Sequence, residues 1–276
     1  MGVSFPLRKG APTSILPVIV PRMNVRFASL LTSLVLVVAN PLQAETTDQW
    51  IAKARAYLGS ESALNSVSTI HFKGTLETIS AGADNKSIPT GLLNKVPVEI
   101  IFQKPCQQQM TVTRPDGVDT MVLDDYDGWS RSTSQLNPKQ SRVSVLDVEQ
   151  IKQLRANTWE NLSFFAGLDK KGGRVDSGAE VSVDGIDCVK LSFIHSDGIV
   201  FHRYFDRSSG RLVKTETANG SAIREEGELI VNGIRFPKKI LNETANGLVT
   251  VITFDSVVLN ESIPVASFAV PSLLAD

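Results

Sequence analysis

Residues 181–247 read VSVDGIDCVKLSFIHSDGIVFHRYFDRSSGRLVKTETANGSAIREEGELIVNGIRFPKKILNETANG, and a turn-forming pair that ends in glycine recurs in them every 10 to 14 residues. The six pairs are Asp184-Gly185, Asp197-Gly198, Ser209-Gly210, Asn219-Gly220, Asn232-Gly233 and Asn246-Gly247. Asn-Gly and Asp-Gly suit two-residue hairpin turns because both central positions need positive φ. One strand fits between neighbouring pairs. The chain after Gly172-Gly173 therefore predicts seven strands in a row, in a curved antiparallel sheet, a sandwich or a barrel.

The preceding part of the chain predicts further strands. Apolar and polar residues alternate over 69–77 and 96–104, as in half-buried strands. Shorter strands are expected at 110–113 and 119–123, turns at Asp116-Gly117 and Asp127-Gly128, and a polar loop at 78–93.

Two helices are predicted from their N-capping residues. Thr46 has Gln49 three positions later, and Asp147 has Gln150, so each pair forms a capping box ahead of apolar residues at helical spacing. The second helix is expected to end near Gly167, and its broad apolar side is wide enough to cover a sheet.

Residues 1–44 differ from the rest of the chain. They hold four basic residues and no acidic one, and an apolar stretch runs from Phe27 to Ala39. This pattern is typical of a secretory signal, with cleavage expected after Ala44. Met23 is a normal signal start, so residues 1–22 are interpreted as an over-long start assignment, and an uncleaved anchor is the alternative. The expected organisation is an N-terminal extension with signal, 1–44, and a single domain, 45–276.

The composition excludes several classes of protein. Hydrophobic residues make up 42% and charged residues 21%, which indicates neither disorder nor multiple membrane spans. Beyond residue 44 the chain has 24 basic and 29 acidic residues, a net charge of −5. We expect no nucleic-acid partner, because binding phosphates requires a basic surface.

Cysteines and histidines are few. In an oxidising compartment Cys106 and Cys188 can form a disulfide, and two separate buried thiols are equally compatible with the sequence. His195 and His202 flank the Asp197-Gly198 turn and could approach each other across a hairpin. Their spacing matches no standard metal site, so we expect no metal.

Catalytic motifs are also missing from the sequence. There is neither a nucleophile elbow nor a His-Glu-x-x-His pair. We expect a protein without enzymatic activity or cofactor; an enzyme would rely on His195, His202 and Asp197. The charge run Arg224, Glu225, Glu226 and Glu228 is interpreted as the outer face of a strand.

A secreted β protein without catalytic groups can instead build an apolar cavity between its sheet and a covering helix. Each methylene buried there is worth about 0.8 kcal/mol, so an acyl chain binds tightly without chemistry. The same apolar side chains could equally fill a core, because periodicity does not separate the two.

Several stretches resemble LolA-like proteins. They are Ala54-Arg-Ala-Tyr-Leu-Gly, Ile70 to Leu76, the hairpin Tyr204-Phe-Asp-Arg-Ser-Ser-Gly-Arg-Leu-Val213, Val231 to Lys238, and Phe254 to Pro271. The resemblance implies a mainly β (α+β) fold in which a curved antiparallel sheet forms an unclosed β-barrel covered by helices. It also implies a periplasmic carrier of lipid or lipoprotein acyl chains towards an outer membrane.

The resemblance gives candidate residues for the cavity, but no matching motif places a carrier's functional arginine at Arg114, Arg131 or Arg142. The apolar cavity candidates are Phe72, Ile100, Phe102, Met110, Val112, Trp129, Trp159, Leu162 and Phe165. The expected protein is a monomer that binds lipid or lipoprotein acyl chains. The alternative is an envelope protein-interaction or stress-sensing module of the same fold, with an envelope membrane protein as partner.

Overall fold

All seven strands predicted after Gly173 are present, and they follow one another as neighbours in one antiparallel sheet. In the computed structural model, which describes residues 45–80, 95–137, 141–196 and 198–271, they are β7 (Arg174–Val183), β8 (Ile186–Ser196), β9 (Ile199–Asp206), β10 (Leu212–Thr217), β11 (Ala222–Val231), β12 (Ile234–Glu243) and β13 (Leu248–Leu259). The turns Asp184-Gly185 and Asn232-Gly233 have positive φ at both positions, as a type I′ hairpin turn requires. The expected signal segment, 1–44, and residues 81–93 of the expected loop lie outside the described residues.

Six strands precede this meander, two more than predicted. They are β1 (Thr69–Ser80), β2 (Val96–Gln103), β3 (Gln107–Arg114), β4 (Gly117–Asp124), β5 (Asp127–Ser134) and β6 (Ser141–Val145). The predicted turn at Asp127-Gly128 is wrong: these residues begin β5, and the turn lies at Asp125-Tyr126, with Asp125 at φ 52°. The sequence pattern missed β5 and β6 because both are rich in Ser and Arg, so no apolar alternation marks them.

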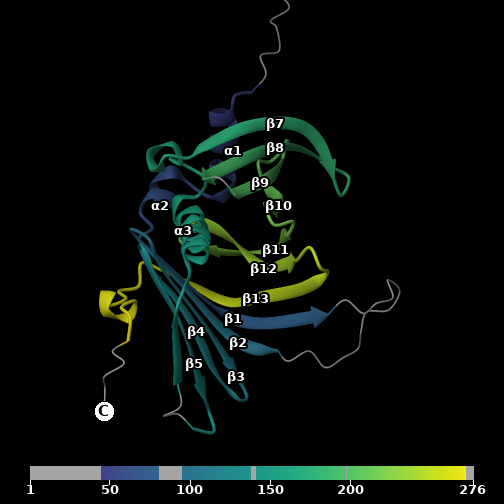
Figure 1. Cartoon of the computed structure of the whole chain (residues 1–276). Helices are drawn as coiled ribbons and strands as arrows, with labels where there is room; N and C mark the ends of the chain where they lie inside the picture. Colours follow the sequence, from purple (N-terminus) through teal and green to yellow (C-terminus); the bar gives the residue numbers. More distant parts are fainter. Residues whose placement is uncertain (1–44, 81–94, 138–140, 197, 272–276) are drawn as a thin grey trace, which may run out of the picture. The chain divides into compact units, whose positions relative to one another are not determined.

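Strand β1 joins the two meanders. It pairs with β2 on one side and with β13 on the other, so that Phe72 lies between Ile100 and Val257. The strand order is β6-β5-β4-β3-β2-β1-β13-β12-β11-β10-β9-β8-β7, which leaves β6 and β7 as unpaired edges among the described residues. Figure 1 shows this open sheet curving around the third helix, α3. The predicted unclosed β-barrel covered by helices is confirmed.

Both capping boxes form as predicted. Thr46 caps α1 (Thr47–Leu58) and Asp147 caps α3 (Val148–Ser163), and in each case the glutamine side chain also accepts from the backbone N–H of the cap. A short helix, α2 (Glu61–Asn65), follows α1, and two 3-10 turns, η1 (Asp169–Lys171) and η2 (Val265–Ser267), lie later in the chain.

Helix α3 ends before the predicted Gly167. Phe164 and Phe165 take positive φ values of 50° and 72°, which breaks the helix after Ser163. Nη1 of Arg55, from α1, donates to the carbonyl oxygens of Ser163 and Phe164, each at 2.8 Å. These bonds satisfy carbonyl groups that a helix C-terminus leaves open, so a contact between distant segments helps to fix where the helix stops.

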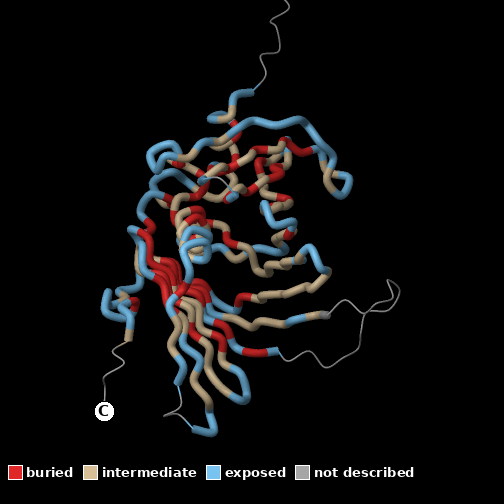
Figure 2. The backbone as a smooth tube through the Cα atoms, in the orientation of Figure 1, coloured by how far each residue is buried: buried red, intermediate tan, exposed pale blue. Residues whose placement is uncertain are grey.

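The core lies on the face of the sheet that α1 and α3 cover. One apolar cluster joins β1, β2, β12 and β13 to the C-terminal end of α3, and a second joins β8 and β9 to α1 and α3. In Figure 2 the buried segments gather around α3 and along β8 and β9, whereas the far ends of β3 to β5 are intermediate or exposed. The helices therefore cover only part of the curved sheet.

The C-terminal segment packs on the other face. Phe268 is fully buried against Ile101, Val122 and Trp129. The indole Nε1 of Trp129 donates to the carbonyl oxygen of Phe268 at 3.0 Å. Because side chains alternate along a strand, Ile101 points away from the face that carries Ile100 and Phe102.

Candidate functional site

A cavity of about 600 Å³ lies between α3 and the inner face of the sheet. Its wall is formed by α1, α3, β1, β2, β3 and β9 to β13. A volume of this size is within the range of small-molecule sites, roughly 300–1,000 Å³. The site therefore has room for a ligand of modest size.

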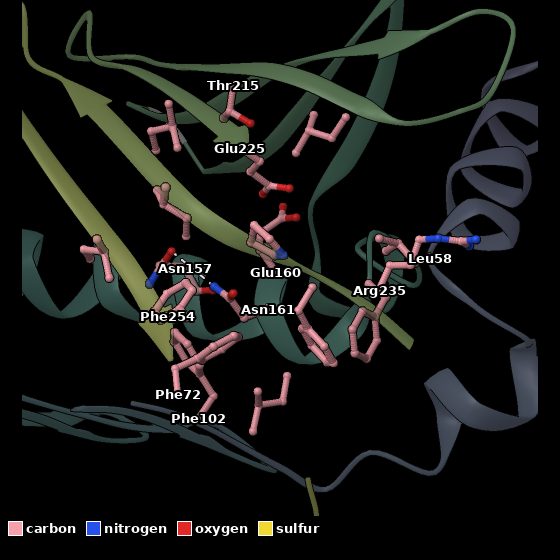
Figure 3. Close-up of a pocket in the computed structure, with 18 of the residues that line it drawn as sticks. Leu58, Phe72, Phe102, Asn157, Glu160, Asn161, Thr215, Glu225, Arg235 and Phe254 are labelled. Carbon is pink, nitrogen blue, oxygen red and sulfur yellow. Dashed lines mark hydrogen bonds between the residues drawn. The ribbon is translucent and has the colours of Figure 1, made fainter. Parts of the chain in front are cut away.

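One part of the wall is apolar. Phe72 packs against Phe102, Phe236 and Phe254, with ring centroids 4.5 to 6.3 Å apart. Further apolar lining residues are Ile70, Ile100, Met110, Ile240 and Ile252. Figure 3 shows Phe72, Phe102 and Phe254 grouped on one side of the cavity. A methylene chain would displace no polar contact along this wall.

Another part of the wall carries a buried charge cluster. The side chain of Glu160, on α3, is only 3% exposed. Its Oε1 lies 2.6 Å from Nε2 of His195, and its Oε2 lies 3.0 Å from Nη1 of Arg203. The Arg203 contact has an ion-pair distance without hydrogen-bond geometry, so Glu160 Oε2 and Arg203 Nε have no hydrogen-bond partner among the described residues. Buried polar groups are rarely left in this state.

Two further charged residues, Arg211 and Glu225, line the polar wall without an ion pair among the described residues. Glu225, on β11, lines the cavity and has intermediate exposure. Burial raises the pKa of the Glu225 carboxyl, and the nearby Arg203 and Arg211 only partly oppose this. Figure 3 shows Glu225 and Glu160 reaching into the cavity from β11 and α3. The raised pKa widens the pH range over which the Glu225 carboxyl holds its proton.

Close to α1, the wall contains a linked set of polar groups. The hydroxyl of Tyr57 donates to Glu228, and Nη1 of Arg235 donates to the carbonyl oxygen of Tyr57 at 2.6 Å. Arg235 Nε lies 3.4 Å from Glu228 Oε2. Burial and the hydrogen bond to Glu228 raise the pKa of Tyr57 to about 12, so the phenol stays protonated at neutral pH.

The structure places five of the nine candidate residues at this cavity: Phe72, Ile100, Phe102, Met110 and Phe165. The other four lie elsewhere. Leu162 and Val112 belong to the apolar core, and Val112 also borders a second, more open hollow of about 310 Å³ next to Arg131 and Arg142. Trp159 packs against His195, and Trp129 lies under the C-terminal segment on the opposite face.

The two histidines do not meet. His195 bonds to Glu160 on the inner face, whereas Nδ1 of His202 lies 2.8 Å from Oγ of Ser192. Odd and even positions of β8 and β9 point to opposite faces of the sheet, so the predicted approach across the hairpin is wrong. No group of three or more His, Cys, Asp or Glu side chains able to hold a metal occurs among the described residues.

The two cysteines are free in the structure, each buried in a different place. Cys106 lies beside α3, with Sγ 4.0 Å from the carbonyl oxygen of Arg155, and Cys188 lies in a cluster with Tyr204 and Val213. Burial raises the pKa of both thiols, so neither is an activated nucleophile.

The charge run Arg224, Glu225, Glu226 and Glu228 lines the cavity at Glu225 and Glu228, contrary to the prediction that it forms an outer face. Ile223 and Glu225 both line the cavity, while Arg224 and Glu226 pair with Asp184 and Lys239. The period of two was visible in the sequence and could have placed Glu225 beside Ile223. Glu160, Arg203 and Arg211 carried no comparable local signal.

These features define a class of protein: an open β-sheet that curls around a helix and holds a mixed apolar and polar cavity. Within the described residues, no helix has the length and apolar character needed to cross a membrane. The sequence matches no protein-family model, and a search of curated proteins finds no relative.

Comparison with solved structures identifies the fold. A LolA superfamily protein from Nitrosomonas europaea matches 82% of this chain and 98% of its own at a TM-score of 0.54, with 16% identity. A putative outer membrane lipoprotein-sorting protein domain from Vibrio parahaemolyticus matches 81% and 97% at 0.51, with 13% identity. A DUF1329 family protein from Desulfovibrio piger matches 80% and 96% at 0.51, with 12% identity. The chain therefore has a LolA-like fold, as the resemblance implied.

Proposed function

We propose that this protein is a non-enzymatic periplasmic binding or carrier protein for lipids or lipoprotein acyl chains. The observation that carries the proposal is the cavity between α3 and the sheet, with its wall of phenylalanine and isoleucine side chains. Burial of one acyl chain there supplies about 0.8 kcal/mol per methylene. The secretory signal expected in 1–44 and the fold shared with a putative lipoprotein-sorting domain support the periplasmic assignment.

The proposal is tested by native mass spectrometry of the protein purified from a periplasm without detergent. We expect an added mass that organic extraction identifies as an acylated molecule, and uptake of a fluorescent fatty-acid probe by the delipidated protein. A bare mass together with no probe uptake would contradict the proposal.

A substitution that fills the cavity should weaken binding of the fatty-acid probe. Ile240 lines the cavity on β12, opposite Ile252 on β13. In Ile240→Trp the indole would occupy the space of the chain, so we expect probe affinity to fall at least about tenfold, or about 1.4 kcal/mol. A fluorescence titration measures this. The matched control is Ile230→Trp, at a 64% exposed position on β11, which should bind the probe as the parent protein does. If both variants bind the probe equally well, the ligand does not occupy the space beside Ile240.

A protein-interaction module is the second candidate. The observation that favours it is the open edge of the sheet at β7, whose residues are mostly exposed and which pairs only with β8 among the described strands. Such an edge can accept a strand from a partner. This reading predicts that an envelope protein binds at least as tightly as free lipid. A proline substitution in β7 should then weaken binding of the envelope protein and leave lipid binding unchanged.

A further inference from the structure

Helix α3 turns a polar face towards the cavity. Asn157, Glu160 and Asn161 lie three and four positions apart, so they share one side of the helix, and all three line the cavity. Figure 3 shows the three side chains in the cavity wall. A helix that covers a sheet usually directs an apolar stripe towards it, so packing alone does not account for this polar face.

The strand registers bring a second set of polar residues together on the sheet. Thr215 on β10 lies opposite both Arg203 on β9 and Ile223 on β11. Ile223 in turn lies opposite Asn242 on β12. Residues directly opposite each other in a sheet point to the same face, and all four of these residues line the cavity. Both the helix and the sheet therefore present polar groups to the cavity.

Three atoms of these two walls have no hydrogen-bond partner among the described residues: Glu160 Oε2, Arg203 Nε and Asn242 Oδ1. Glu160 and Arg203 are each more than nine-tenths buried, so bulk solvent does not satisfy them. The two oxygens accept hydrogen bonds, whereas Arg203 Nε donates one. A ligand that satisfies all three atoms must bring donors and an acceptor together, and a hydroxyl group is both.

The charges of the wall favour a head without charge. Among the described residues that line the cavity, three glutamates and three arginines give a formal sum of zero. Glu160 with Arg203, and Glu228 with Arg235, already form ion pairs. A charged head would add an unbalanced charge to this wall, and an unpaired buried charge is costly. A hydroxyl group that finds hydrogen-bond partners avoids that cost.

We infer that the ligand is a single-chain lipid with a neutral polyol head, of which a monoacylglycerol is the simplest example. One head hydroxyl donates to Glu160 Oε2 and accepts from Arg203 Nε, and another donates to Asn242 Oδ1. The acyl chain lies along the apolar wall around Phe72, in a cavity with room for a ligand of modest size. This inference rests on the proposed lipid-binding function and names the head group that the same site takes.

The first experiment compares three ligands that share a twelve-carbon chain: 1-monolauroylglycerol, its dimethyl ether and laurate. The ether keeps the glycerol skeleton without a hydrogen-bond donor, and laurate carries a charge. The full chain is expressed and delipidated, and binding is measured by isothermal titration calorimetry. We expect monolauroylglycerol to bind at least about tenfold more tightly than either of the other two ligands.

The other outcomes separate the head group from the lipid-binding function. If the dimethyl ether binds as tightly as monolauroylglycerol, water rather than the ligand satisfies the three atoms, and the inference is wrong. If laurate binds as tightly or more tightly, the head is not neutral. Either result leaves the proposed function standing, whereas no binding of any of the three ligands would overturn both.

A variant of the sheet wall tests where the head lies. Asn242→Leu keeps a side chain of similar size but removes the accepting oxygen, so we expect monolauroylglycerol to bind about tenfold more weakly and the dimethyl ether to bind as before. The matched control is Asn65→Leu, at an exposed position on α2 outside the cavity lining, which should bind both ligands as the parent protein does.

Unchanged binding of monolauroylglycerol by Asn242→Leu would overturn this placement of the head. The comparison of the three ligands in the parent protein remains decisive even if the variant fails to fold.

Discussion

Glu160→Leu is expected to lower the free energy of unfolding by about 3–5 kcal/mol, because it leaves Arg203 buried without its counter-charge. Glu160 is the acid of the charge cluster in the cavity wall, with His195 at 2.6 Å and Arg203 at 3.0 Å. The Arg203 guanidinium is also enclosed by the rings of Phe165, Phe193 and Phe201, at 4.8 to 5.7 Å from its Cζ. Water therefore has little access to replace the lost carboxylate.

Urea unfolding measures this effect, and the same helix supplies the control. Glu149 pairs with Lys152 at 2.7 Å, but its side chain is 74% exposed, so Glu149→Leu should change stability by less than about 1 kcal/mol. The double variant Glu160→Leu with Arg203→Met should recover most of the loss, since it buries no charge. If Glu160→Leu is no less stable than Glu149→Leu, the cluster does not hold α3 on the sheet.

Gly74→Val is expected to destabilise the protein by about 3 kcal/mol or more, because no side chain fits where β1 meets β13. A Cβ at Gly74 would collide with the carbonyl oxygen of Thr253 and lie 2.9 Å from the Cα of Phe254. The register of the two strands shifts between Lys73 and Gly74, so the close approach accompanies a bulge. Only backbone movement in both strands could relieve the clash.

The loss of stability should extend beyond β1, because the pairing of β1 with β13 joins the two meanders. Thermal unfolding followed by circular dichroism measures the loss, and Thr75→Ala, at the next position, serves as the control with an expected change within about 1 kcal/mol. If Gly74→Val is as stable as the control, the paired strands β1 and β13 accommodate a side chain at this position.

Local chemistry made one half of the fold predictable. The positive φ that a tight hairpin requires selects Asn-Gly and Asp-Gly, so the six glycine pairs located all seven strands of the second meander. The capping boxes at Thr46 and Asp147 located α1 and α3, because each box is formed by residues only three positions apart in the sequence. The turn before β5 was misplaced where polar residues obscured the strand pattern.

The cavity could be predicted only in part. Alternation placed Phe72, Ile100 and Phe102 on one side of their strands, and the resemblance made them and Met110 cavity candidates. The structure puts these four at the cavity. Trp129 lies on β5, which no apolar alternation marks, and the sequence contains nothing to show that its side of β5 faces Phe268 rather than α3. The face of each strand depends on register, and register is set by pairing across the sheet.

By itself, the sequence determined the hairpins, the helix starts and the antiparallel character of the sheet, since each depends on residues a few positions apart. Only the tertiary structure decided that β1 closes against β13, about 180 residues along the chain. It alone brought Glu160, Arg203, Arg211 and Glu225 to one cavity wall. Such contacts join distant segments through the curvature of the whole sheet, and a local pattern does not encode that curvature.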